Sequence, residues 1–582
     1  MSSQFRLRLL PILLAATAAP LFGQTQNPKP SGPPPPVIRA TTRLIQVDVV
    51  VQNEKGEPVE DLKQEDFSIL DQGKPQQVAL FPARSAASRE RSQLPVLPPR
   101  LFSNRFGETG QQAPHSVTVI LFDTVNTSIS DIPYAREQVI KFLKQLRPGD
   151  HVAIYLLGRQ LTVLNEFTQD VSSLLHAIER FSGAFSPQLD ATNLELTDSA
   201  TFRSNSYAEE AIASRLKEFL DRISGPLGYS ESIGAAWPTC RALEAIANHV
   251  ASIPGRKSLV WVSGAFPISI GYDKELLFKP VEHRDVVEVI ERAARALNHA
   301  NMAIYPVDAR GLMTPALYDA ANRTRLSRNP RDDAPLGVPG PDHRIETMIA
   351  LADRTGGKAF YNTNDMEGSV RRAIEDGQSS YTLGFYPAHR KWDGKFHQLK
   401  VQVKEKGLSV RYRKGYFAKA EPADGSLESK RVLDDAVRSP VDWTNLDLHV
   451  ALGAFEPSSH NLEVQIALDT HELGFEQKDG RWKAKIYVVF VQLGKGNKSL
   501  TSEQKTFVLN LKPETYNRWM QNHTEFSVTL ALSPEIEALR VVAADASSNS
   551  IGTLTIPIKR VLLAETVPTN NPPAEEEPQL LD

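Results

Sequence analysis

The stretch VTVILF at residues 117–122 carries no charged side chain, so it predicts a strand that is covered on both faces of its sheet. VAIYLL at residues 152–157 and SLVWVS at residues 258–263 have the same character. Helical patterns lie between these strands, from about residue 132 to 146 and from 239 to 252. Strands that alternate with helices pair in parallel through right-handed crossovers. The sequence therefore predicts an α/β fold with a doubly wound, Rossmann-like sheet.

Two polar stretches interrupt this alternation and are predicted as insertions, at residues 184–236 and 310–343. With both insertions, the α/β domain is expected to span residues 115–379. Its helical pattern contains Cys240, which is expected to be buried. Because Cys240 is the single cysteine, the sequence excludes an intramolecular disulfide and a cysteine-cluster metal site.

Alternating polar and apolar residues predict strands on both sides of the α/β domain. Segments 40–83 and 380–418 each hold too few strands to be stable alone, so we predict that they pair as one small β-sandwich. Residues 84–114 are polar and interrupted by prolines, which predicts a linker. Many short strands with turn signals predict a second β-sandwich at residues 430–565. The Pro- and Glu-rich tail at 566–582 is predicted to be disordered.

The amino-terminal residues predict export. Arg6 and Arg8 precede an apolar run from Leu9 to Phe22, which is typical of a secretory signal peptide at residues 1–23. The run is shorter than the ~20 residues that a bilayer span needs, so a membrane anchor is the less favoured alternative. The proline-rich residues 24–39 are predicted as a semi-rigid linker. We expect a periplasmic or extracellular protein with no integral membrane span after cleavage.

The overall charge argues against two classes of partner. The chain has 66 Lys and Arg against 69 Asp and Glu, so it lacks the basic excess that nucleic acids and anionic membranes favour. The HExxH, GxSxG and P-loop signatures of common enzyme classes are also missing from the sequence. We therefore expect a non-enzymatic protein with a protein partner, and the sequence leaves its oligomeric state open.

Polar residues follow three of the predicted strands, at the edge where doubly wound sheets bind ligands. They are Asp123 after residues 117–122, Ser263 after residues 258–262 and Asp308 after residues 302–307. Asp123 is itself followed by Asn126, Thr127 and Ser128. Such carboxylate, amide and hydroxyl oxygens suit a hard cation such as Mg²⁺ or Ca²⁺. The alternative is that Asp123 caps the following helix or organises its loop.

Several blocks, in this order, resemble the von Willebrand factor type A domain, and in particular the type A-related group of acidobacteria. The blocks are VILFDTVNTS (119–128), YAREQVIKFLKQLRPGDHVAIYLL (134–157), ALEAIANHVASIPGRKSLVWVSGAFP (242–267), ALNHANMAIYPVDARGL (296–312), LADRTGGKAFYNTND (351–365) and YRKGYFA (412–418). The resemblance covers roughly residues 40–420 and leaves residues 430–582 outside it.

The resemblance implies a metal-ion-dependent adhesion site, which in type A domains holds Mg²⁺ through a DxSxS motif, a later Thr and a later Asp. Asp123 matches the first Asp and Thr127 the second Ser, whereas Val125 replaces the first Ser. Thr239, or Trp237 in another register, falls at the Thr position, and Ser263 replaces the later Asp. The implied site is therefore degenerate. The ligands of this site would be Asp123, Thr127, Thr239 and Ser263, and the bound ion would be Mg²⁺, Ca²⁺ or Mn²⁺. The residues that face the partner would be Asn126, Ser128 and Asp308.

Two functions follow from this sequence. The first is an exported adhesion-type module that binds a protein partner at this degenerate site. The alternative is a structural or assembly scaffold of the cell envelope that has no metal site and binds its partners through the β domains.

Overall fold

A computed structural model of the 582-residue chain describes residues 44–59, 61–81, 97–98, 100–106, 116–158, 160–180, 237–253, 255–264, 282–312, 341–388, 392–419, 426–521, 524–559 and 561. The predicted signal peptide (1–23), proline-rich linker (24–39) and tail (566–582), and most of the two insertions (184–236 and 310–343), lie outside these residues. Among the helices that are described, none is both long and apolar enough to cross a membrane.

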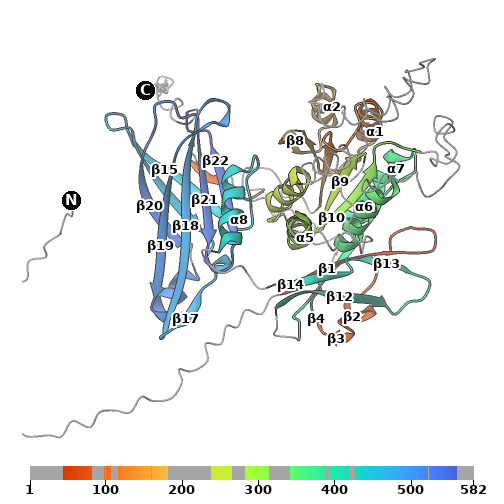
Figure 1. Ribbon diagram of the computed structural model, residues 1–582. Helices are drawn as coiled ribbons and strands as arrows, with labels where there is room; N and C mark the ends of the chain where they lie inside the picture. The colour runs from red at the N-terminus through yellow and green to blue at the C-terminus, as the bar shows by residue number, and fades with distance from the viewer. Residues whose placement is uncertain are drawn as a thin grey trace, which may run out of the picture. The chain divides into compact units, whose positions relative to one another are not determined.

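A five-stranded sheet forms the centre of the α/β domain (Figure 1). Its strands are β6 (Val117–Asp123), β7 (Val152–Leu157), β8 (Leu161–Thr168), β9 (Lys257–Ser263) and β10 (Met302–Asp308). They lie in the order β10-β9-β6-β7-β8, and all pairs are parallel except β7 with β8. Counted along the chain, this is the order 3-2-1-4-5 of a doubly wound sheet, which reverses between β6 and β9.

Helices cover both faces of this sheet because successive strand side chains point to opposite sides. Val119 and Leu121 pack with the helical residues 237–249, with α5 (Glu282–His299) and with α6 (Pro341–Thr355). Ile120 and Phe122 pack on the other face. The helices there are α1 (Ile132–Leu143), α2 (Val171–Arg180) and α7 (Met366–Gln378). Cys240 lies in the first of these two cores and is buried, which confirms its prediction.

Strands from both sides of the α/β domain meet in two small antiparallel sheets. One sheet has the order β13-β1-β11-β4 and the other β14-β12-β2-β3. The strands are β1 (Ile45–Gln52), β2 (Phe67–Asp71), β3 (Lys74–Gln76), β4 (Val78–Leu80), β11 (Ser380–Phe385), β12 (Asp393–Val403), β13 (Ser409–Tyr412) and β14 (Gly415–Lys419). Their buried side chains form one core, so segments 45–80 and 380–419 fold together.

The last described part of the chain is a pair of antiparallel sheets around another core. The first sheet has the order β20-β16-β15-β5, and in the second β18 pairs with β17, β19 and β21, and β21 with β22. The strands are β5 (Leu101–Ser103), β15 (Leu448–Glu456), β16 (Asn461–Leu468), β17 (Glu476–Lys478), β18 (Arg481–Leu493), β19 (Ser499–Leu511), β20 (Thr524–Ala531), β21 (Ala538–Asp545) and β22 (Ile551–Ile556). The helices are α8 (Leu427–Arg438) and α9 (Pro513–Trp519). The predicted fold class, a doubly wound α/β domain with β domains beside it, is confirmed.

Strand β5 corrects one part of the predicted organisation, because it lies inside residues 84–114, which were predicted as a linker. It pairs with β15, so residues 101–103 complete a sheet of the carboxyl-terminal sandwich. The Asn104 amide nitrogen donates to the carbonyls of Trp443 (2.9 Å) and Leu446 (3.0 Å), and its oxygen accepts from Leu448 N (2.9 Å). A strand of three residues shows no periodicity, and these contacts cross more than 300 positions of sequence, so no local pattern predicts it.

Candidate functional site

The Asp123 carboxylate lies at the end of β6, beside the point where the strand order reverses, and is completely buried. Its Oδ1 accepts hydrogen bonds from the backbone N–H groups of Val125 (3.0 Å) and Asn126 (3.1 Å). Its Oδ2 accepts from Asn126 Nδ2 (2.7 Å), Trp261 Nε1 (3.0 Å) and Ser263 Oγ (3.0 Å). Five donors therefore converge on one carboxylate.

The Asn126 side chain connects this carboxylate to the helix of residues 237–249. The same Nδ2 that donates to Asp123 also donates to Thr239 Oγ1 at 2.8 Å. The nitrogen of the amide must face both groups, because its oxygen would repel the carboxylate. The amide group therefore lies between Asp123 and Thr239, which are two of the predicted cation ligands.

Thr127 joins the same loop to the strand β9. Its hydroxyl donates to the backbone oxygen of Asp123 and accepts from Gly264 N at 3.0 Å. A Cβ atom at position 264 would lie 2.9 Å from the Asn126 carbonyl oxygen, so only glycine allows this approach. The loop after β6 is therefore held against the end of β9 by backbone and side-chain contacts together.

Burial and hydrogen bonding act in opposite directions on the pKa of Asp123. Burial, which is the larger effect, raises the pKa, and the donors from Asn126, Trp261 and Ser263 lower it. The net result is a pKa above the ordinary aspartate value. The donors thus only partly replace the water that the ionised carboxylate loses.

The structure brings most of the predicted site residues together and places two of them differently. Asp123, Asn126, Thr127, Thr239 and Ser263 form the network described above. Asp308 instead accepts three hydrogen bonds from Arg310, from its backbone N (3.0 Å), Nε (2.9 Å) and Nη2 (2.8 Å). Ser128 lies beyond the network, with its hydroxyl 2.7 Å from that of Ser130.

The donor set at Asp123 does not fit a divalent cation. Mg²⁺ and Ca²⁺ need oxygen lone pairs, and a carboxylate offers about four lone-pair sites. Five N–H and O–H donors already occupy the lone-pair sites of the Asp123 carboxylate. The Trp261 and Asn126 N–H groups among them have no lone pair with which to bind a cation. The network contains no second carboxylate, so these residues favour the alternative in which Asp123 organises its loop.

Sequence reasoning missed Trp261 as a member of the site. Its indole N–H is the donor that reaches Asp123 from the neighbouring strand. The signal was present, because side chains two positions apart in a strand share a face, and Trp261 precedes Ser263 by two. Alternation predicts the shared face, but not that the indole nitrogen reaches the carboxylate.

A second acidic group lies in the carboxyl-terminal sandwich, where Asp447, Asp469 and Glu472 have carboxylate oxygens within 4.8 Å of one another. Arg105 Nε pairs with Asp447 Oδ2 at 2.8 Å, and Glu472 accepts from Asp447 N at 2.7 Å. Burial, together with the neighbouring Glu472, raises the pKa of Asp447 to about 6. Arg105 therefore already supplies the positive charge that this group attracts.

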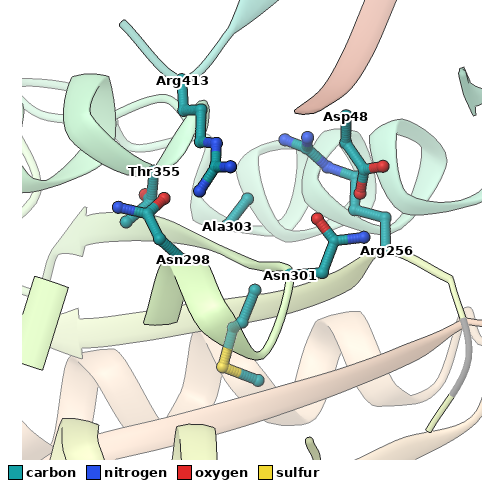
Figure 2. Close-up of a pocket in the computed structure, with 8 residues that line it drawn as sticks. Asp48, Arg256, Asn298, Asn301, Ala303, Thr355 and Arg413 are labelled. Atoms are coloured by element: carbon teal, nitrogen blue, oxygen red, sulfur yellow. The ribbon is translucent and has the colours of Figure 1, made fainter. Parts of the chain in front are cut away.

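A small polar cavity of about 10 Å³ lies between β1 and the amino end of the parallel sheet, with room for one water molecule (Figure 2). Asp48, Arg256 and Arg413 line it. Arg256 Nη2 donates to the Gly356 carbonyl at 2.7 Å, and Lys257 Nζ donates to the Ala300 carbonyl at 2.7 Å.

The Gly356 and Ala300 carbonyls follow the carboxyl ends of α6 and α5, where the helix dipoles favour cations. Burial lowers the pKa of Lys257 to about 8, and Asp48 opposes this effect. The Asp48 carboxylate thus balances buried cations where the small sandwich meets the α/β domain. This cavity is too small for an organic ligand, so we interpret it as a structural junction.

Comparisons with known proteins give weak likenesses. No protein-family model matches the chain, and a search of curated proteins finds no match. Among solved structures, the chain is similar to an aerotolerance-related membrane protein from Bacteroides fragilis, with 13% identity over 44% of this chain and 98% of the other, at a TM-score of 0.22. It is also similar to the SpRpn10 VWA domain, with 13% identity over 33% and 74% of the two chains, at a TM-score of 0.16.

A third likeness is to proximal thread matrix protein 1 from the mussel byssus, whose structure has a zinc-occupied MIDAS motif. The identity is 10% over 48% of this chain and 49% of the other, with a TM-score of 0.21. Likenesses at these scores carry no argument about this chain. The fold class therefore rests on the strand order of the parallel sheet.

Proposed function

We propose that this chain is an exported, non-enzymatic binding or assembly protein whose type A-like domain works without a cation. One observation carries the proposal: the Asn126 amide lies between Asp123 and Thr239 and donates to both. In this position a neutral amide bridges the two groups that a cation would otherwise join. The carboxyl edge then acts as a rigid support, and partners bind elsewhere, on the β domains or on the loops around the edge.

The network also supports the non-enzymatic part of the proposal. The buried polar groups at the carboxyl edge are engaged with one another, and the Asp123 carboxylate accepts from five donors. A general base needs an available lone pair within reach of a substrate proton. Asp123 has none left, and its complete burial keeps substrates away from it.

The second candidate is the adhesion-type module with a bound cation. It is favoured by the close approach of the four predicted ligands. Ser263 donates to the Asp123 carboxylate, Thr127 donates to the Asp123 backbone oxygen, and Asn126 links the carboxylate to Thr239. For a cation to enter, the amide of Asn126 would have to leave its position.

A cation titration separates the two candidates. Thermal unfolding of the purified chain is measured in EDTA and then with Mg²⁺, Ca²⁺ or Mn²⁺. We expect the same unfolding midpoint in all four conditions. A cation at ~100 times its dissociation constant would stabilise the folded state by about 2.7 kcal/mol. A midpoint that rises with any of these ions, and falls back in EDTA, would overturn the cation-independent proposal.

The Asn126→Asp variant supplies the matched positive control. It replaces the bridging amide with a second carboxylate beside Asp123, and like charges this close destabilise the folded state. A divalent cation between the two carboxylates and Thr239 would relieve that repulsion, so this variant should gain a cation-dependent midpoint. Asn126→Ser removes the amide without adding a charge and should remain insensitive to cations. Cell fractionation tests the export part of the proposal, which an exclusively cytoplasmic chain would contradict.

A further inference from the structure

Strand β19 has one long edge without a strand partner among the described residues. It pairs with β18 from Ser499 to Leu511, and this pairing is regular from Thr501 onward. Figure 1 shows β19 beside β18 as a long strand of this sheet. An unpaired edge exposes a row of N–H and C=O groups that can pair with another strand. Residues 501–511 contain no proline and no bulge to prevent this pairing.

The side chains on the outer face of β19, at even positions 502–510, are also uncovered. Residues of α8 and the segment after it pack on the outer face of β18, β21 and β22 in a small cluster that includes Ala436, Val489 and Val542. No β19 residue belongs to that cluster, and Val508 is 71% exposed. Side chains of residues 501–504 are exposed on both faces of the strand. The edge therefore has space for another strand beside it.

Geometry limits how β19 can pair with itself. In an antiparallel pair, facing residues must point to the same face of the sheet, because side chains alternate with a period of two. A twofold axis perpendicular to the sheet must therefore pass through a residue position of each strand. An axis at Glu503 places the two glutamates opposite each other, and an axis at Lys505 does the same with the two lysines. Like charges directly opposite each other destabilise a strand pair.

An axis at Gln504 has the opposite result. Each Glu503 then faces Lys505 of the second copy, and the strand contributes two such pairs. Glu503 and Lys505 already form an ion pair within one strand, which places both on the same face. The remaining central pairs join Ser502 with Thr506 and Thr501 with Phe507, and none of them opposes like charges.

We propose that this chain forms an antiparallel dimer in which β19 pairs with β19 of a second copy about an axis at Gln504. The inference is independent of the proposed function, since it uses no residue of the Asp123 network. Strand-edge pairing alone forms a small interface, and interfaces below ~1,200 Å² are weak or transient. The dimer should therefore be concentration-dependent.

Charge reversal tests the register. Analytical ultracentrifugation of the full chain should show a monomer that becomes a dimer as its concentration rises. Glu503→Lys alone, or Lys505→Glu alone, places like charges at both cross-strand pairs and should weaken dimerisation by about tenfold or more. An equimolar mixture of these two variants should dimerise again, because lysines of one copy then face glutamates of the other. The doubly reversed chain should also recover.

Three outcomes would overturn the proposal: a wild-type chain that stays monomeric at every concentration, single variants that dimerise as the wild type does, or a mixture that does not recover. A cysteine at the axis gives a second readout. Gln504→Cys should form an intermolecular disulfide on mild oxidation, whereas Val508→Cys should not, since position 508 does not face itself. The native Cys240 is buried, so it should not contribute to intermolecular cross-linking. A cross-link at 508 and not at 504 would contradict the register.

Discussion

Replacing Asp123 with asparagine tests whether the buried network holds the carboxyl edge of the sheet. Asparagine keeps the shape of the side chain but exchanges one acceptor oxygen for an NH₂ group. In one orientation this NH₂ faces the backbone N–H groups of Val125 and Asn126. In the other it faces the donors of Asn126, Trp261 and Ser263. Both orientations bring donors against donors.

The first orientation is the less costly one, and it leaves two buried backbone N–H groups without an acceptor. Each such orphaned donor costs roughly 1–3 kcal/mol. Part of this loss is offset, because burial raises the pKa of Asp123 and so disfavours its ionised form, which asparagine lacks. We expect Asp123→Asn to lower the free energy of unfolding by about 3 kcal/mol. For a domain of this size the unfolding midpoint would fall by roughly 6–12 °C.

Urea and thermal unfolding, followed by circular dichroism, measure this loss. Asp308→Asn is the matched control, because Asp308 is also a buried carboxylate at a strand end. Two of its three hydrogen bonds come from the partly exposed guanidinium of Arg310, which can turn toward water, and only the third comes from a backbone N–H, so we expect a loss of about 1 kcal/mol. A loss below about 0.5 kcal/mol for Asp123→Asn would refute the reasoning, because two buried N–H groups without an acceptor should destabilise the folded state by more than this.

Three further changes test other parts of the structure. Asp48→Asn removes the carboxylate beside the buried cations and should lower the free energy of unfolding in urea by about 3 kcal/mol. The control Thr382→Val removes only a hydrogen bond to Asp48 and should lower it by about 1 kcal/mol. Equal losses for the two variants would argue against a charge effect. Asn104→Ala removes a partner from the Leu446 carbonyl and from Leu448 N, whereas the Trp443 carbonyl keeps its hydrogen bond from Thr553 N. This change should destabilise the carboxyl-terminal sandwich by about 3 kcal/mol, and Arg105→Ala by less than about 1 kcal/mol. The reverse order would contradict the role assigned to Asn104. The pKa of Asp447 is raised to about 6 in the folded state, so the folded chain holds the carboxyl proton more tightly than the unfolded chain does. The stability that this proton adds is fully present below about pH 4 and is lost as the pH rises through 6. The wild-type chain should lose on the order of 2 kcal/mol relative to Asp447→Asn between these pH values, and parallel stability curves for the two chains would contradict that pKa.

Local patterns were sufficient to predict the α/β domain. Continuous apolar runs such as residues 117–122 and 152–157 became β6 and β7, which are buried on both faces. Periodicity also predicted two of the helices that cover them, α1 and the helix of residues 237–249. These signals are local, because burial on one or two faces of an element selects apolar residues at positions that lie within a few residues of one another.

Strand β5 shows where local patterns fail. Its three residues carry no period, and their place in a sheet depends on Asn104 and on partners beyond residue 440. Hydrogen bonds to distant residues therefore decide that this segment is a strand.

The candidate site divides in the same way. The sequence by itself determined that Asp123 and Ser263 lie at one edge of the sheet, because parallel pairing brings the carboxyl ends of strands together. The structure added that their two strands are neighbours. The sequence also determined the departures from the adhesion motif at Val125 and Ser263, since these are residue identities. It left open whether the remaining oxygens hold a cation or only one another.

Only the tertiary structure shows which groups these oxygens face. The Asn126 amide reaches Thr239, which is 113 positions away, and Trp261 reaches Asp123 across 138 positions. Hydrogen bonds depend on distances of about 3 Å and on the direction of each donor, and no spacing in the sequence encodes these. The sequence placed the polar residues at one edge of the sheet, and the fold determined that their lone pairs face N–H and O–H groups.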